Sequence, residues 1–90
     1  MPPERFSVTV EVQLRPGIAD PQGATIERAL PALGVRGVSG VRAGKSFRFE
    51  VDATDRDDAL SRARLVADRL LANPVIEESS VTVGAGPATV

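Results

Sequence analysis

The chain has 90 residues and a mass of 9.5 kDa, which allows one domain, because two halves of this length would each be too short for a stable core. Eleven basic and twelve acidic residues give a net charge of −1, so the chain has no positive field to attract nucleic acid or an anionic membrane. Cysteine and histidine are both absent, which excludes disulfides, the usual zinc sites and catalysis by a thiolate or an imidazole.

These limits predict a cytoplasmic protein that binds no cofactor and no metal. No stretch of the sequence approaches the roughly 18 apolar residues of a membrane span, and the first residues lack the apolar segment of a signal peptide. A domain of this size buries roughly 60 to 65% of the surface that its unfolded chain exposes. We therefore expect a thin core that association with a partner would extend.

The first predicted element is a strand over residues 6–14. Apolar side chains alternate with polar ones from Phe6 to Leu14, which is typical of a strand with one face in water. Pro16 and Gly17 follow, and they predict that the strand ends in a loop.

A first helix is predicted from Pro21 onward. Asp20 is a favourable N-cap residue, and Pro21 suits the first helical position, where its missing N–H costs nothing. Pro31 removes a helical hydrogen bond and predicts a kink or an early end, with Gly34 closing the segment. The residues at helical spacing on one face are Gln22, Ile26, Ala29, Leu30 and Leu33.

Residues 35–42 predict a bent or bulged strand. Two glycines interrupt this segment, and its valines, Val38 and Val41, are spaced by three, which strict alternation forbids. A turn over residues 43–45 leads to a regular strand, in which apolar and charged residues alternate over residues 47–51. The two strands are expected to form a hairpin.

The second helix has the clearest pattern in the sequence. Residues 54–57 supply an N-cap and place acidic side chains in the first turn, where the helix dipole favours negative charge. Asn73 and Pro74 predict the end of the helix. Leu65 falls on the exposed face, among charged side chains. The residues expected on the buried face are Ala59, Leu60, Ala63, Val66, Ala67, Leu70 and Leu71.

A last strand is predicted over residues 75–83, and residues 84–90 are expected to form a flexible tail. The elements follow the order β-α-β-β-α-β in a single domain of residues 1–83. This order is typical of the α+β class with a ferredoxin-like or split β-α-β fold, in which both helices lie on one face of an antiparallel sheet. The sheet edges and one semi-polar face favour a dimer.

Three motifs occur in an order and spacing that one family shares. They are Asp20-Pro21-Gln22-Gly23 at the start of the first helix, Val41-Arg42-Ala43-Gly44-Lys45 at the hairpin turn, and Leu70-Leu71-Ala72-Asn73-Pro74-Val75-Ile76-Glu77 at the end of the second helix. With these motifs the chain resembles the PurS subunits of phosphoribosylformylglycinamidine synthase over residues 6–83. Pro31 and Pro74 depart from the family's pattern, and Pro31 leaves the geometry of the first helix open.

The resemblance implies a small non-catalytic subunit. In that family PurS assembles with the synthetase PurL and the glutaminase PurQ. The complex converts formylglycinamide ribonucleotide, ATP and glutamine to formylglycinamidine ribonucleotide in purine biosynthesis, and it passes ammonia internally between two active sites. The chain is therefore expected to be an adaptor that forms a homodimer or a dimer of dimers, contacts PurL and PurQ, and carries no catalytic residue.

The motifs and one surface leucine supply the candidate partner contacts, which are Asp20, Gln22, Gly23, Arg42, Gly44, Lys45, Leu65, Asn73 and Glu77. Most of them also have a simpler structural explanation. Asp20 caps a helix, and Gly44 suits a turn with positive φ. Asn73 suits a helix end, and a single exposed leucine such as Leu65 is ordinary. Gly23 is different, because glycine inside a helix costs up to about 1 kcal/mol relative to alanine.

Two other functions fit parts of the pattern. An amino-acid-sensing regulatory module has the same order of elements, so fold order alone does not exclude it. An acylphosphatase-like hydrolase needs an arginine in a glycine-rich loop after the first strand. Residues 37–42 resemble that loop, but they follow the first helix instead. Glu77 and Glu78 are adjacent on a strand, so they point to opposite faces and cannot act as a paired acid and base.

Overall fold

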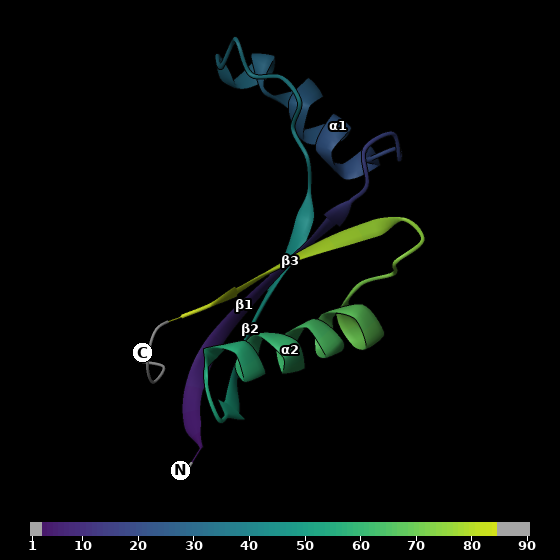
Figure 1. Ribbon diagram of the computed structural model, residues 1–90. Helices are drawn as coiled ribbons and strands as arrows, with labels where there is room; N and C mark the ends of the chain where they lie inside the picture. Colours follow the sequence, from purple (N-terminus) through teal and green to yellow (C-terminus); the bar gives the residue numbers. More distant parts are fainter. Residues whose placement is uncertain (1–2, 85–90) are drawn as a thin grey trace.

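The computed structural model describes residues 3–84, and its sheet has three antiparallel strands in the order β2-β1-β3. Figure 1 shows α2 below this sheet and α1 well above it. The elements in chain order are β1 (Glu4–Leu14), α1 (Pro21–Ala29), the 3-10 turn η1 (Pro31–Leu33), β2 (Gly44–Ala53), α2 (Arg56–Val66), the π-helical turn η2 (Ala67–Leu71) and β3 (Glu77–Val83).

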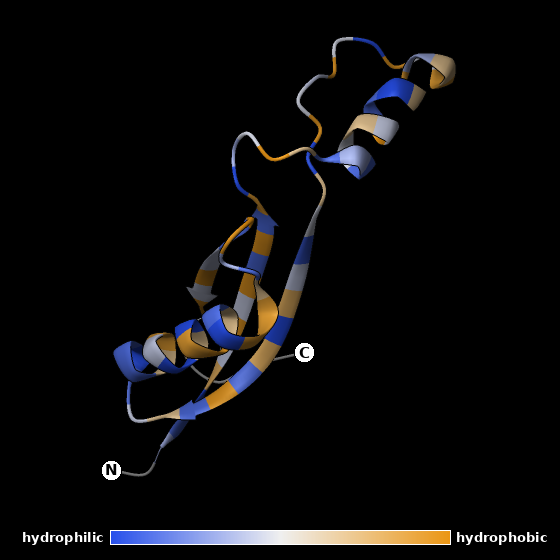
Figure 2. Cartoon of the chain, turned by 90° about the vertical axis from the view of Figure 1, so that its right-hand side faces the viewer, coloured by the Kyte–Doolittle hydropathy of each residue, from blue (hydrophilic) through white to orange (hydrophobic). Residues whose placement is uncertain are grey.

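The central strand β1 carries most of the core. It pairs along nearly its whole length with β2, from Glu4 opposite Ala53 to Gln13 opposite Gly44, and its second half pairs with β3. Val8, Val10 and Val12 are almost completely buried on the face toward α2. The alternation predicted for the first strand is confirmed, and Figure 2 shows it as alternating orange and blue along the strands.

Helix α2 covers this apolar face through small side chains. Ala59, Ala63 and Ala67 are fully buried against the valines of β1. Because alanine projects so little, the helix backbone can lie close to the sheet. The predicted N-terminus is confirmed at Asp55, whose carboxylate accepts a hydrogen bond from the Asp58 N–H at 2.8 Å.

One residue of the predicted buried face lies outside it. Leu70 is 79% exposed, whereas Leu71 packs against the core. The last turn of the helix is π-helical, with the Ala72 N–H bonded to the Ala67 carbonyl. A π turn contains one more residue than an α turn, so the residues after Ala67 are rotated away from the positions that the 3.6-residue period predicts.

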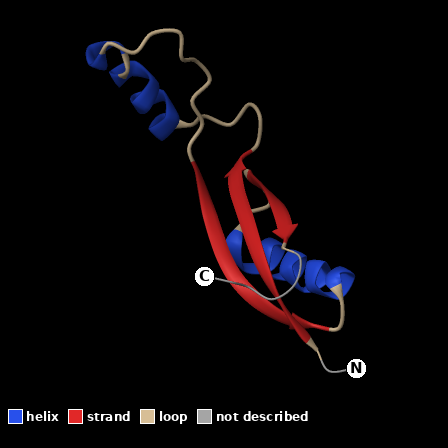
Figure 3. Cartoon of the chain, turned by 90° about the vertical axis from the view of Figure 1, so that its left-hand side faces the viewer, coloured by secondary structure: helices blue, strands red, loops and turns tan. Residues whose placement is uncertain are grey.

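Residues 15–43, here called the arm, project from the end of the sheet. Helix α1 lies in the arm and does not pack on the sheet, as Figures 1 and 3 show. The expectation that both helices cover one face is therefore wrong for α1 within a single chain. The radius of gyration is 16.9 Å, against about 12 Å for a compact chain of this length.

The strand predicted over residues 35–42 is absent, and so is its hairpin. Gly37 and Gly40 have φ values of 81° and 70°, which are left-handed and incompatible with a continuous strand. The partner of β2 is β1 instead. The early end of the first helix is confirmed: α1 stops before Pro31, and Gly34 closes η1 with a φ of 82°.

The last strand begins two residues later than predicted, at Glu77. Gly84 donates its N–H to the Ser7 carbonyl at 2.8 Å, so it continues the sheet rather than opening a tail. Residues 85–90 of the expected tail lie outside the described residues. In residues 3–84, no helix combines the length and the apolar character needed to cross a membrane. The α+β class with an antiparallel sheet is confirmed.

The close approach of α2 to the sheet predicts the effect of enlarging Ala63. Ala63→Val should lower the free energy of unfolding by about 1–3 kcal/mol, because the added methyl groups have no space to occupy. Ser61→Val introduces the same β-branched side chain at an exposed site of α2, where it has space, and should change stability by about 0.5 kcal/mol or less. Urea denaturation of both variants measures the difference, and equal effects would contradict close packing at Ala63.

Candidate functional site at the base of the arm

The motif residues that the sequence singled out meet where the arm joins the sheet. This place is formed by the end of β1, the start of α1, the start of β2 and the start of β3. A hollow of about 280 Å³ lies there, lined by Gln13, Leu14, Asp20, Pro21, Gln22, Ala43, Gly44, Lys45 and Glu77. Leu65, which is 58% exposed on α2, lies outside this group.

Asp20 connects the two chain segments that form the arm. Its Oδ1 accepts a hydrogen bond from the Gly23 N–H at 2.9 Å, and its Oδ2 accepts one from the Ala43 N–H at 2.8 Å. The Arg42 Nε lies 3.7 Å from the same Oδ2, and the Asp20 side chain is only 8% exposed. The hydrogen bonds from Gly23 and Ala43 hold the pKa of Asp20 below its ordinary value, and Arg42 acts in the same direction.

Glu27 makes a second connection of the same kind. Its Oε1 accepts a hydrogen bond from the Val41 N–H at 2.9 Å. The N–H groups of Val41 and Ala43 are two residues apart on the returning segment, and each is bound by a carboxylate of the α1 region. Sequence reasoning did not single out Glu27, because its partner is 14 residues away.

Close backbone contacts explain the two motif glycines. A Cβ atom on Gly23 would lie 2.7 Å from the Asp20 Oδ2 and would collide with the Val41 carbonyl oxygen. A Cβ atom on Gly44 would lie 2.7 Å from the Val12 carbonyl oxygen. Gly44 has no positive φ and begins β2, so its interpretation as a turn residue is wrong.

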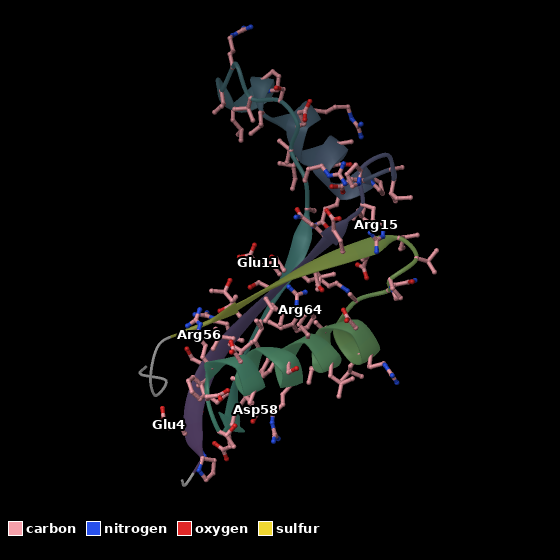
Figure 4. All side chains as sticks on the ribbon, in the orientation of Figure 1. Glu4, Glu11, Arg15, Arg56, Asp58 and Arg64 are labelled. Carbon is pink, nitrogen blue, oxygen red and sulfur yellow. The ribbon has the colours of Figure 1, made fainter. Side chains whose placement is uncertain are left out.

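Two arginines join the base of the arm to neighbouring segments. Arg42 donates from Nη2 to the Leu14 carbonyl at 3.0 Å. Arg15 donates from Nε and Nη2 to the Pro74 carbonyl, at 3.1 and 2.9 Å, and its own N–H binds the Ile76 carbonyl. In Figure 4, Arg15 lies beside the start of β3. The end of β1 is thus tied to the segment between α2 and β3.

Lys45, Glu77 and Asn73 form a further chain of contacts. The Lys45 Nζ lies 3.5 Å from the Glu77 Oε2, and the Glu77 Oε1 accepts the Asn73 N–H at 2.7 Å. Lys45 lies in β2 rather than in a turn. The Asn73 Oδ1 accepts the Val75 N–H at 3.1 Å, so Asn73 forms a turn after η2, which itself ends at Leu71. Gln22 lines the hollow and is exposed.

The chemistry of this site is that of a structural junction. Its carboxylates accept backbone N–H groups or form ion pairs, and the lowered pKa keeps Asp20 ionised rather than preparing it to exchange protons near neutral pH. Residues 3–84 contain no group of three acidic side chains placed to hold a metal ion. The arrangement can fix the arm relative to the sheet.

Comparisons with known proteins agree with the motif pattern. The profile of the family described as "PurS: Phosphoribosylformylglycinamidine (FGAM) synthase" matches residues 7–85. The phosphoribosylformylglycinamidine synthase subunit PurS of Mycobacterium leprae is 48% identical over 73 residues, which are 81% of this chain and 89% of that protein.

Solved structures show the same fold. The crystal structure of the Thermotoga maritima purS subunit has a TM-score of 0.84 and 35% identity, and the match covers 91% of this chain and 94% of that one. A chain in the structure of PurLQS from the same organism has a TM-score of 0.83 and 37% identity, with 93% of this chain and all of that chain covered (100%).

The close contacts of Gly23 predict whether Gly23→Ala raises or lowers the stability of the protein. Helix propensity alone would make Gly23→Ala stabilising by up to about 1 kcal/mol. The collision with Val41 predicts the opposite: lower stability and faster hydrogen exchange at the Ala43 amide, because the Asp20 bond to it is displaced. Ala24→Gly, at the exposed neighbouring position, should cost up to about 1 kcal/mol without changing exchange at Ala43. Denaturation and amide exchange test both variants, and a stabilised Gly23→Ala protein would refute the close contact.

Proposed function

The chain belongs to the PurS family, and we propose that it acts as the small, non-catalytic subunit of a phosphoribosylformylglycinamidine synthase in purine biosynthesis. The observation that carries this function is the match over nearly the whole chain, both to a PurS subunit in sequence and to a chain of the PurLQS structure in fold. The expected partners are therefore a PurL and a PurQ subunit. This family match favours the adaptor over the amino-acid-sensing and acylphosphatase-like alternatives.

The finer role that we propose is to bridge PurL and PurQ and to support the transfer of ammonia derived from glutamine. The geometry supports an adaptor, because the residues at the base of the arm bind one another and hold an extended shape. Such a shape can contact two proteins at once, whereas a compact domain of the same size offers less surface. The cytoplasm remains the proposed location, supported by membership of this biosynthetic family.

The arm is the proposed surface for a second copy of the chain. Its apolar side chains have no core of their own: Leu33 is 75% exposed, and three further arm residues, Ile26, Val35 and Val38, are also exposed. Figure 2 shows orange, hydrophobic stretches along the arm, away from the sheet. Exposed apolar side chains gathered in one segment mark a protein interface. A homodimer would supply the burial that the single chain lacks.

Reconstitution tests the proposed role. The protein alone should hydrolyse neither glutamine nor ATP, and its addition to PurL and PurQ should restore glutamine-dependent synthesis of formylglycinamidine ribonucleotide. PurL supplied with free ammonia should depend on it less, because that reaction needs no internal transfer. Assays of the three proteins in every combination measure this. Glutamine-dependent activity of equal size without this chain would refute the role.

Substitutions on the surface test which parts of the chain make contacts. Leu33→Asp should shift the protein toward monomer in sedimentation at micromolar concentration, and Ala32→Asp, exposed in the same turn, should not.

Leu65→Asp should leave the melting temperature nearly unchanged and weaken oligomer or complex formation, with Ser61→Asp on the same helix as its control. A large loss of stability with intact assembly would show that Leu65 has a structural role instead.

A further inference from the structure

The two aspartates that cap the helices do different work. The Asp55 carboxylate accepts a hydrogen bond from Asp58, three residues along the chain, and its cap needs no more than this. The Asp20 carboxylate caps α1 in the same way and also binds Ala43, which is 23 residues away. Helix capping therefore explains the hydrogen bond to Oδ1 but not the hydrogen bond to Oδ2.

The role of this second hydrogen bond follows from the place where the pairing of β1 with β2 ends. The pair Gln13–Gly44 is the last of the β1–β2 pairing, and beyond it the two segments of the arm do not pair with each other as strands. Side chains make the connection across the arm there: Asp20 to Ala43, Glu27 to Val41 and Arg42 to Leu14. The outgoing side contains Gly17, with a φ of 87°, in the loop before α1.

We propose that Asp20 is a positioning residue that sets the orientation of the arm relative to the sheet. The inference rests on the proposed function of the arm as an interface, and it names the residue on which the geometry of that interface depends. Asp20 stands at the start of the arm, next to the loop where the chain leaves β1. A change of angle there moves every apolar side chain farther along, including Leu33, because α1 and η1 follow it and do not pack on the sheet.

The carboxylate is suited to this role because it has two equivalent acceptor oxygens. An asparagine has one acceptor oxygen and an NH₂ group that only donates. Asparagine caps helices as well as aspartate does, so Asp20→Asn keeps the cap. With its oxygen kept on the Gly23 N–H by the cap, the NH₂ group of the asparagine faces the Ala43 N–H, which then meets a donor instead of an acceptor.

The first experiment compares Asp20→Asn with the matched variant Asp55→Asn, by hydrogen exchange of individual amides. In Asp20→Asn the exchange at Ala43 should become at least about tenfold faster, because a charge-assisted hydrogen bond is lost. In Asp55→Asn the exchange at Ala43 should not change. Asp20→Ser, whose short side chain can cap but has a single oxygen, should behave like Asp20→Asn.

The second experiment measures the orientation itself. The sequence contains no cysteine, so spin labels can be placed at Arg36→Cys in the arm and Ser80→Cys on β3, both of which are exposed. Labelled chains diluted with unlabelled ones report the distance within one chain. A narrow distribution is expected for the unaltered protein and for Asp55→Asn, and a clearly broader one for Asp20→Asn, below the unfolding temperature of each.

The outcomes separate this inference from the proposed function. A distribution as narrow in Asp20→Asn as in the unaltered protein, or equally broad in both variants, would overturn the positioning role. A broad distribution in Asp20→Asn alone supports it. Assembly of that variant with PurL and PurQ then tests the function: unimpaired assembly with a loosened arm would refute the arm as an interface and leave the positioning role of Asp20 intact.

Discussion

The hydrogen bond between the Asp20 carboxylate and the Ala43 N–H is the contact on which the shape of this protein depends. On one side of it lies a conventional α+β unit, in which a ladder of strands and one helix hold each other through buried alanines and valines. On the other side lies an arm with neither ladder nor core. The arm has no apolar core to hold it in place. It is held instead by hydrogen bonds in which backbone N–H groups donate to side-chain carboxylates. The hydrogen bonds that a buried carboxylate accepts from two such groups are stronger than those accepted by a neutral oxygen.

A small apolar core beside an arm held by hydrogen bonds agrees with an adaptor function. A core built mainly from valine and alanine is small, and a single helix covers one face of the sheet. Further large apolar residues are exposed on the arm, on the outer side of α2 and η2, and in the segment before β3, where Leu33, Leu70 and Val75 are the most exposed. A chain of this length that folded into one compact layer pair would bury them. The extended form instead keeps them available to other chains, as expected for a subunit whose family functions in a complex.

Local sequence patterns were reliable wherever neighbouring residues decide the structure. The alternation of β1, the caps at Asp20 and Asp55, and the end of α1 before Pro31 all follow from residues within one or two turns. The errors have a common origin. The pattern around Val38 and Val41 was consistent with a bent strand, but no strand lies beside it to pair with. Leu70 fits the helical period, and the π turn after Ala67 changes that period.

The sequence by itself determined the class of fold, the absence of histidine and cysteine chemistry, and the motifs that placed the chain in its family. The tertiary structure decided what those motifs do. It brought Asp20 to Ala43, Gly23 to Val41 and Lys45 to Glu77, residues that are far apart in the chain. A helix cap, a glycine or a surface lysine has the same local pattern whether or not a distant segment lies against it. The distance between such segments depends on the packing of the whole sheet, which no short stretch of sequence contains.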